Sequence, residues 1–231
     1  MAKTVVIPNH IGLILDGNRR WAKAQGLPNL EGHRIGYSNL KDIGRHAVKR
    51  GVPYISAYIF SAENWNRSKD EVKYLMDLAL WLTTHELNEV NKDGIRVRFL
   101  GRRDGLSDKL VKVIQKAEEL TKNNSKGTLA LCFNYGGQQE IVDATNKLLK
   151  QAKSSTEITL EKFASMLYAP EIPPVDFIIR TSGEQRISNF MLWRAAYSEL
   201  YFTDKHWPDF TTKDLDDALV EFAKRRRRFG A

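Results

Sequence analysis

The stretch Leu13–Lys23, LILDGNRRWAK, ends a run of apolar residues abruptly at the carboxylate Asp16. A glycine, an asparagine, two arginines and a tryptophan follow directly. A short, continuous apolar run that ends at a turn is typical of a strand buried on both faces, as strands of parallel sheets are. Ligands of such sheets bind beyond the carboxyl ends of the strands, so this stretch predicts a binding site.

Short apolar runs alternate with longer amphipathic segments along the rest of the chain. The predicted strands are Ile11–Leu15, Tyr54–Phe60, Ile95–Leu100, Leu129–Phe133 and Val175–Ile179, with Leu200–Thr203 as a candidate sixth. The predicted helices are Tyr37–Arg50, Asp70–Lys92, Leu106–Asn123, Gln138–Gln151, Leu160–Leu167 and Asp214–Arg227. This alternation predicts an α/β fold with a mainly parallel central sheet flanked by helices. No linker or repeat divides the sequence, so we expect one domain over residues 1–231.

The composition is that of an ordinary soluble protein, with 42% hydrophobic and 28% charged residues. The longest apolar run, Leu78–Leu82, is far shorter than the roughly 20 residues of a membrane-spanning helix. The N-terminus lacks a signal-peptide pattern, and Cys132, the only cysteine, is expected to be a small buried residue. We therefore expect a cytoplasmic protein.

The net charge is +8, and Lys224–Arg228 carries five of the positive side chains. Such an excess is compatible with nucleic acid, an anionic membrane surface or phosphorylated substrates as partners. Charge alone does not choose among these three classes.

A polar segment follows each of the first five predicted strands. The five segments are Asp16–Trp21, Ser61–Arg67, Gly101–Asp104, Asn134–Gly137 and Arg180–Asn189. Four of them combine turn residues with charged, amide or hydroxyl groups, and we expect these to meet at one edge of the sheet. Ordinary polar turns are the alternative interpretation, which the many Arg and Trp residues disfavour.

The chemistry of this edge is that of phosphate binding. The planar fork of arginine matches phosphate oxygens and keeps its charge near neutral pH. Among these cations Asp16 suits a Mg²⁺ ligand, because Mg²⁺ takes one or two carboxylates together with substrate phosphates. A helix cap or an arginine partner is the structural alternative for Asp16. The sequence lacks P-loop, dinucleotide-binding, zinc and serine-hydrolase motifs.

The predicted helix over Asp70–Asp93 is apolar around much of its circumference, since Leu78, Leu80 and Trp81 widen its hydrophobic stripe. A helix that is apolar on more than one face is buried on more than one face. A core or subunit-interface helix explains this pattern, and so does the wall of an apolar tunnel for a hydrocarbon chain.

Six segments together resemble the cis-prenyltransferase family, most closely its bacterial undecaprenyl diphosphate synthases. They are HIGLILDGNRRWAKAQG (10–26), GHRIGYSNL (32–40), YIFSAENWNR (58–67), NYGG (134–137), IIRTSGEQRISNFMLW (178–193) and AYSELYFTDKHWPDF (196–210). They follow the family's order over nearly the whole chain. The resemblance implies Mg²⁺-dependent elongation of an allylic diphosphate, typically farnesyl diphosphate, by successive head-to-tail additions of isopentenyl diphosphate with cis double bonds. It also implies a homodimer, a hydrophobic tunnel between sheet and helices, and undecaprenyl diphosphate or a similar polyprenyl carrier lipid for cell-wall synthesis as product.

The resemblance implies roles for individual residues as well. Asp16 and Asn64 would be catalytic, with Asp16 and Glu199 as metal ligands and Asn64 as proton acceptor or relay. The allylic substrate would contact Gly17, Asn18, Arg19, Arg20, Trp21, His33, Ser61, Ala62, Glu63, Trp65 and Arg67. Isopentenyl diphosphate would be held by Arg180, Arg186, Ile187 and Ser188.

Three positions depart from the family pattern. Arg19 stands where many bacterial members have glycine, and Gln185 stands where some have a histidine near the metal. Asn29, a candidate substrate-binding residue, replaces an arginine that grips diphosphate in many members. The basic tail has three interpretations: a solvated helix end, an electrostatic contact to anionic lipid, or a segment that reaches the active site of a partner subunit.

Two other functions compete with the prenyltransferase. An RNA-binding protein would use the basic tail and aromatic residues, but Asp16, Glu63 and Glu199 would repel RNA, so we expect no nucleic-acid partner. A catalytically silent subunit of the same fold would lack some of the implied site residues, whereas this chain has them. Peripheral membrane contact, through the product or the tail, is compatible with the cytoplasmic location.

Overall fold

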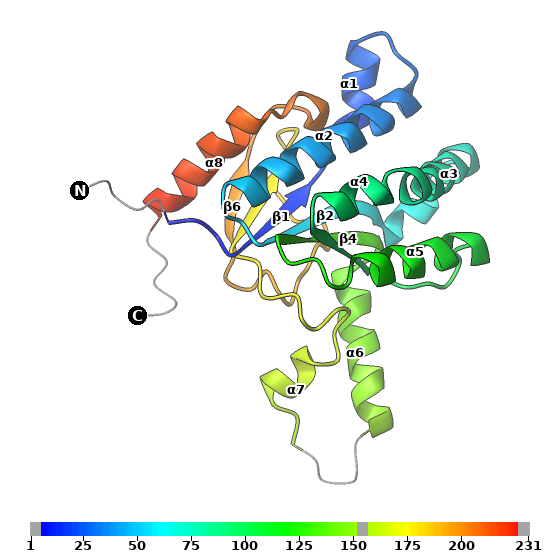
Figure 1. Cartoon of the computed structure of the whole chain (residues 1–231), viewed down its shortest axis with the longest axis vertical. Helices are drawn as coiled ribbons and strands as arrows, with labels where there is room; N and C mark the ends of the chain where they lie inside the picture. The colour runs from blue at the N-terminus through cyan, green and yellow to red at the C-terminus, as the bar shows by residue number, and fades with distance from the viewer. Residues whose placement is uncertain (1–5, 152–156, 226–231) are drawn as a thin grey trace.

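The structure is a computed structural model and describes residues 6–151 and 157–225 (Figure 1). Its centre is a six-stranded parallel sheet with the strand order β3-β4-β2-β1-β5-β6. The strands are β1 (His10–Ile14), β2 (Tyr54–Ser61), β3 (Ile95–Leu100), β4 (Gly127–Tyr135), β5 (Phe177–Arg180) and β6 (Glu199–Phe202). The predicted α/β class and the parallel sheet are therefore confirmed, and the candidate sixth strand is present.

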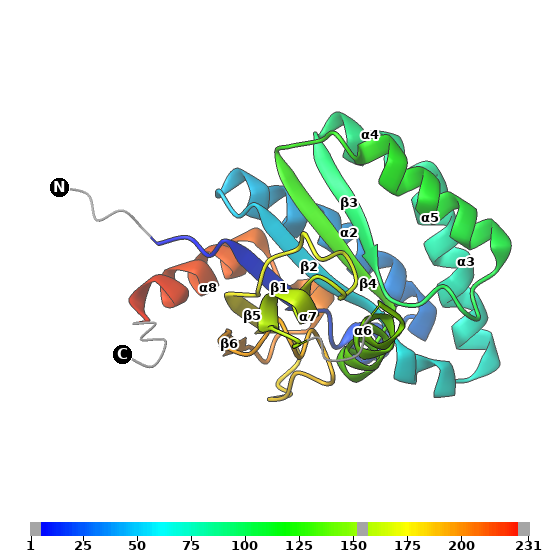
Figure 2. The same cartoon turned by 90° about the horizontal axis from the view of Figure 1, so that it is seen from below.

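Helices pack on the sheet in separate groups (Figures 1 and 2). The helices are α1 (Asn18–Ala24), α2 (Asn29–Lys49), α3 (Lys69–His85), α4 (Leu87–Lys92), α5 (Asp108–Thr121), α6 (Gly137–Gln151), α7 (Leu160–Ala164) and α8 (Thr212–Lys224), with short 3-10 helices η1 (Ala62–Asn66) and η2 (Trp207–Asp209). The apolar sides of α2 and α8 share one core cluster with β1, β2 and β5. Apolar residues of α3, α4 and α5 form another cluster with β3 and β4.

The strand order reverses between β1 and β5. From β1 the chain continues to β2 on one side, whereas β5 continues to β6 on the other side. In parallel sheets, the crevice at such a reversal is where ligands bind. Asp16 follows β1 at this point, and Arg180 ends β5 opposite Ile14, two residues before Asp16. The topology therefore places Asp16 and Arg180 at the position in the sheet where a ligand is expected to bind.

The largest differences from the sequence prediction are in the helices. The seven-residue helix α1 was not among the predicted helices, because it is too short and too polar to show a helical period. Helix α2 begins at Asn29 rather than Tyr37, since the buried glycines Gly32 and Gly36 weaken the helical pattern of its first turns. The helix predicted over Asp70–Lys92 is two helices, which meet at Glu86 without a proline or glycine to mark the break.

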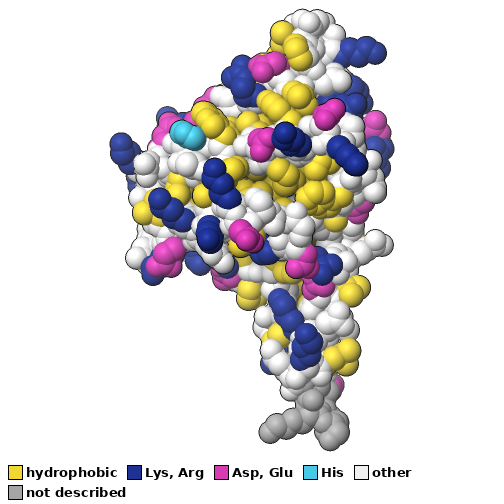
Figure 3. All heavy atoms as spheres, turned by 90° about the vertical axis from the view of Figure 1, so that its right-hand side faces the viewer, with side chains coloured by type: hydrophobic (Ala, Val, Ile, Leu, Met, Phe, Trp, Pro, Cys, Tyr) yellow, Lys and Arg dark blue, Asp and Glu magenta, His cyan; other side chains and the backbone are white. Residues whose placement is uncertain are grey.

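The surface over α3 and α5 mixes apolar and charged side chains (Figure 3). Trp81 is half exposed there and stacks on His85. In the part of the chain that the structure describes, no helix has both the length and the apolar character needed to cross a membrane. The basic tail beyond Arg225 lies outside the described residues, so its three interpretations remain open.

Candidate active site

A cavity of about 640 Å³ opens at the carboxyl ends of β1, β2 and β5. The polar residues that line it come from segments far apart in the sequence. They are Asp16, Asn18, His33, Ser61, Glu63, Asn64, Arg67, Arg180, Arg186, Ser188 and Asn189. The expected convergence of the loops after the first, second and fifth strands is therefore found. The loop after β4 joins them, because the N–H of Gly137 donates to the carbonyl of Asn189 at 2.7 Å.

Asp16 lies between two guanidinium groups. Arg180 Nη2 donates to its Oδ2 at 2.8 Å, and Arg20 Nη2 donates to its Oδ1 at 3.1 Å. Partial burial opposes ionisation, but hydrogen bonds and charge from Arg180 and Arg20 outweigh it and hold the pKa of Asp16 below its ordinary 3.8. The carboxylate therefore contributes stability that is present above its ordinary pKa and is lost as the pH falls through the lower, folded-state pKa.

Arg180 is the hub of the polar wall, and its side chain is only 4% exposed. Its Nη1 donates to the carbonyl of Arg186 and to Ser188 Oγ at 2.7 Å, while its Nη2 holds Asp16. One planar fork thus fixes the end of β1 and the loop after β5 together. Arg186 itself is 59% exposed, pairs with Glu184 and lines the cavity.

Gly17 makes the turn between β1 and α1 with a left-handed φ of 101°. A Cβ at this position would lie 2.6 Å from both Ser182 Oγ and His206 Nδ1, which hydrogen-bond each other. Only glycine satisfies both the backbone angle and this close approach. The turn therefore presses the end of β1 against the loop after β5.

Glu71 gathers two guanidinium groups and an imidazole, and it was missed by the sequence reasoning. Its carboxylate lies 3.3 Å from Arg19 Nη1, 2.9 Å from Arg67 Nη1 and 3.6 Å from His33 Nε2. Burial is the main reason that the pKa of His33 is lowered, with Arg67 adding to it, so His33 is neutral near pH 7. The spacing Ser68-x-x-Glu71 indicates only a helix cap, which Ser68 does form with the Glu71 N–H. The α1 turn is thus tied to the start of α3.

Replacing Arg19 by alanine is expected to change little. Its side chain is 53% exposed, and an exposed ion pair contributes at most about 1 kcal/mol. We expect a loss in unfolding free energy below about 1 kcal/mol, measured as the urea midpoint at pH 7. The matched variant Arg67→Ala, which also loses its pair with the buried Glu71, is expected to lose more; an equal or larger loss for Arg19→Ala would contradict this assignment.

Asn64 and the two candidate tryptophans hold local structure. The Asn64 carboxamide oxygen accepts the N–H of Ser61 at 3.1 Å, which leaves its amide hydrogens for the cavity. Trp65 Nε1 donates to Asn134 Oδ1, and Trp21 Nε1 donates to Asp209 Oδ1 at 2.7 Å. Neither tryptophan is among the residues that line the cavities described in this section.

A second, outer basin of about 490 Å³ adjoins the first at Asp16, Asn18, His33 and Arg67. It is also lined by Gly17, Arg19, Arg20, Lys23 and Asn29. Of the remaining predicted site residues, Ile187 packs in the core beside Phe190, and Ala62 begins η1. Glu63 accepts a hydrogen bond from Asn189, which the sequence reasoning did not single out.

The structure does not bring Glu199 to Asp16. Glu199 begins β6 and is paired in register with Phe177, at the amino end of β5, whereas Asp16 follows the carboxyl end of β1. Its carboxylate binds Arg225 Nη1 at 3.0 Å. Within one chain the two carboxylates therefore lie at opposite edges of the sheet and cannot share one cation. Among the described residues, no three acidic, histidine or cysteine side chains form a metal-binding cluster.

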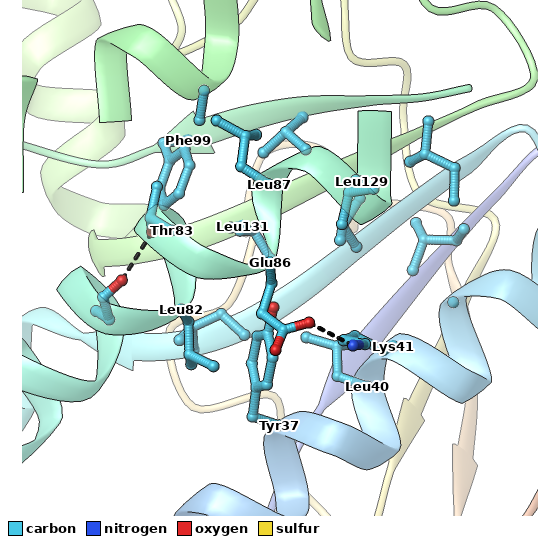
Figure 4. A pocket seen from close by; sticks show the side chains of 18 of the residues that line it. Tyr37, Leu40, Lys41, Leu82, Thr83, Glu86, Leu87, Phe99, Leu129 and Leu131 are labelled. Atoms are coloured by element: carbon cyan, nitrogen blue, oxygen red, sulfur yellow. Dashed lines mark hydrogen bonds and ion pairs between the residues drawn. The ribbon is translucent and has the colours of Figure 1, made fainter. Parts of the chain in front are cut away.

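An apolar cavity of about 90 Å³ lies between α2, α3 and the sheet (Figure 4). Tyr37, Leu40, Ile59, Ala79, Leu82 and Phe133 line both this cavity and the large polar one. Burial raises the pKa of Tyr37 to about 12, so its hydroxyl is neutral. A continuous tunnel is not established by these two cavities, and the tunnel stays a prediction.

Comparison with known proteins gives one consistent result. Residues 14–230 match a family model described as "Putative undecaprenyl diphosphate synthase". An isoprenyl transferase of Thermotoga maritima is 47% identical over 97% of both chains. A trans,polycis-polyprenyl diphosphate synthase of Thermobifida fusca, specific for (2Z,6E)-farnesyl diphosphate, is 46% identical over 97% of this chain and 81% of its own. The solved lavandulyl diphosphate synthase of Lavandula x intermedia, in complex with dimethylallyl diphosphate, is 35% identical with a TM-score of 0.91 over 97% of this chain and 99% of its own.

Proposed function

The chain belongs to the undecaprenyl diphosphate synthase family of prenyltransferases, and from this premise we propose its substrates and product. It extends farnesyl diphosphate by successive additions of isopentenyl diphosphate, each with a cis double bond. The product is undecaprenyl diphosphate or a polyprenyl carrier lipid of similar length, used in cell-wall synthesis. The working form is a homodimer, located in the cytoplasm with peripheral contact to the membrane through its lipid product.

One observation carries this proposal. A cradle of guanidinium groups around Asp16 stands at the mouth of a cavity whose deeper wall is apolar, with Leu75, Leu78 and Leu82 along α3. Guanidinium groups bind diphosphate oxygens bidentately. A prenyl diphosphate needs both surfaces: the guanidinium groups bind its diphosphate at the mouth, and the apolar wall contacts its growing hydrocarbon chain.

The reaction is a substitution at the allylic carbon. The C–O bond to the allylic diphosphate breaks, the double bond of isopentenyl diphosphate supplies the electrons of the new C–C bond, and a proton leaves the adjacent carbon. Arg180 and Arg186 hold the diphosphate of isopentenyl diphosphate, while Arg20 and the Asn18 carboxamide face the allylic diphosphate. Fixed donors of this kind stabilise the charge that develops on the leaving group.

We assign the proton to the released diphosphate rather than to Asn64. A carboxamide is a poor base, and the oxygen of Asn64 already accepts the N–H of Ser61. Its amide hydrogens then serve to hold a diphosphate oxygen in place.

The residues at the mouth fit Mg²⁺ as cofactor. Asp16 is ionised and partly exposed, and the oxygen Oδ1 of Asn18 is a buried acceptor without a hydrogen-bond partner. One carboxylate with substrate phosphates is the ligand set that Mg²⁺ commonly takes. When bound, the ion neutralises charge on the departing diphosphate. Asp16 would hold it, and Arg180 would keep that carboxylate oriented.

The activity is tested by incubating the chain with farnesyl diphosphate, radiolabelled isopentenyl diphosphate and Mg²⁺, followed by mass analysis of the extracted lipid. We expect a ladder of polyprenyl diphosphates that differ by five-carbon units and end near eleven units. Absence of any lipid longer than farnesyl would contradict the proposal.

Removing the metal is expected to stop turnover. With excess chelator, incorporation of isopentenyl diphosphate should fall by at least about 10²-fold, because metal stabilisation of phosphate charge is worth several kcal/mol. Restoring Mg²⁺ should recover the rate, which separates the metal effect from denaturation. Full turnover in the presence of chelator would contradict the assignment of Mg²⁺.

A further inference from the structure

Gly44 is a buried glycine in the interior of the 21-residue helix α2. A glycine inside a helix weakens it relative to alanine, so its presence calls for a reason. A Cβ built at Gly44 meets no heavy atom within 4 Å. Gly44 is therefore shielded from solvent, yet the space where its side chain would lie is empty. This space belongs to the apolar cavity, which Gly44 lines.

The other two buried glycines of α2 differ from it. A Cβ at Gly32 would lie 2.0 Å from the carbonyl oxygen of Asn18, and one at Gly36 would lie 2.3 Å from the Asn18 carboxamide oxygen. Close packing of α1 on α2 explains both of them. No neighbouring atom explains Gly44, so the reason for this glycine lies in the empty space itself.

The two cavities follow one another along the same elements. On α2, the polar cavity is lined by His33 and Gly36, both cavities by Tyr37 and Leu40, and only the apolar one reaches Gly44. Helix α3 gives the same order, with Leu75 in the first cavity and Leu82 in both, and Glu86, which follows the helix, lines only the second. From Gly36 to Gly44 the helix advances by about 12 Å. Gly44 therefore lies at the far end, away from the diphosphate cradle.

Two ion pairs of α2, on either side of Gly44 in the sequence, line the apolar cavity. Lys41 Nζ contacts Glu86 Oε2, and Arg45 Nε lies 2.7 Å from Asp93 Oδ2 (Figure 4 shows the first pair). These four charged residues are also among those that line the cavity. They join α2 to Glu86, at the α3–α4 break, and to Asp93, at the end of α4. A hydrocarbon chain gains nothing from contact with these charged groups, so it fills the apolar part of the cavity, which includes the open space beside Gly44.

On the basis of the proposed function, we infer that Gly44 sets the length of the finished hydrocarbon chain. The missing side chain leaves room for the end of the product between α2, α3 and the sheet. Elongation stops when the chain end fills the apolar cavity to which this space belongs. A larger side chain at position 44 shortens the product without touching the diphosphate cradle.

The test uses full-length Gly44→Ala, Gly44→Val and Gly44→Leu with farnesyl diphosphate, excess isopentenyl diphosphate and Mg²⁺. Ser38→Leu adds the same bulk to the exposed side of the same helix and is the matched control. We expect the longest product to shorten by at least one five-carbon unit in Gly44→Leu, in graded fashion along the series. The rate of the first addition should stay within about twofold of wild type, since that step occurs far from Gly44.

Each outcome decides the inference. Unchanged product lengths in folded Gly44→Leu, or in Gly44→Ala and Gly44→Val if the leucine variant does not fold, would overturn it. So would shortening by Ser38→Leu to the same extent, or loss of the first addition in Gly44→Ala. A raised melting temperature of Gly44→Ala would show that the added methyl group is accommodated in a helix. A wild-type chain that makes no lipid longer than farnesyl would instead refute the proposed function.

Discussion

Asp16→Asn is expected to lower kcat/KM for elongation by at least about 10²-fold, because the reaction loses the charge that holds Mg²⁺ at the leaving diphosphate. The amide keeps the size of the side chain and an oxygen that can accept from Arg180. Arg180 also retains its contacts to the Arg186 carbonyl and to Ser188 Oγ. The fold is therefore expected to survive with a loss of about 1–3 kcal/mol in unfolding free energy, the range for hydrogen bonds to charged groups.

The matched control is Asp104→Asn. Asp104 is 74% exposed, pairs with Arg102 and follows β3 at the edge of the sheet. Its replacement should leave turnover unchanged. The two variants would be compared by radiolabelled isopentenyl diphosphate incorporation and by urea unfolding of the same samples. Asp16→Asn that retains near-wild-type incorporation would refute the metal role of Asp16.

Arg180→Lys is expected to be nearly as damaging, although it conserves the charge. A single ammonium cannot reproduce the planar fork that reaches Asp16, the Arg186 carbonyl and Ser188 Oγ together. With the carboxylate and the loop after β5 no longer aligned, we expect kcat/KM for isopentenyl diphosphate to fall by at least about 10²-fold. Much of the effect should be a raised KM, because the loop that carries Arg186 and Ser188 is no longer held in place.

Arg102→Lys provides the comparison for this second substitution. Arg102 is 45% exposed and forms its ion pairs outside the three cavities. Steady-state kinetics with isopentenyl diphosphate varied at saturating farnesyl diphosphate would separate KM from kcat. If Arg180→Lys and Arg102→Lys gave the same KM, Arg180 would have no part in holding the substrate.

Much of the fold could be predicted because its signals are local. Continuous apolar runs identified the strands, and β3 has the predicted bounds Ile95–Leu100. The contact between Asp16 and Arg180 joins residues 164 positions apart, yet it follows from a parallel sheet and from where polar groups end its strands. The break at Glu86 has no such signal, since only packing of α4 against β3 and α5 decides it.

Some residues of the site were predicted wrongly or not at all. Glu199 was grouped with Asp16 by family resemblance, although the predicted strand Leu200–Thr203 begins directly after Glu199 and already places it at the amino edge of the sheet. Glu71 was not recognised as a site residue, because a glutamate three residues after a serine indicates only a helix cap. The open space beside Gly44 could not be predicted, because the sequence does not show which atoms surround a glycine.

The most direct test of the central claim is a crystal structure of the chain with Mg²⁺, isopentenyl diphosphate and a farnesyl analogue whose bridging oxygen is replaced by sulfur. We predict both diphosphates at the carboxyl ends of β1 and β5, beside Asp16 and Arg180, with the farnesyl chain between α2 and α3 and directed toward Gly44. A farnesyl chain on the outer surface of the molecule, or diphosphates bound away from Asp16, would contradict it.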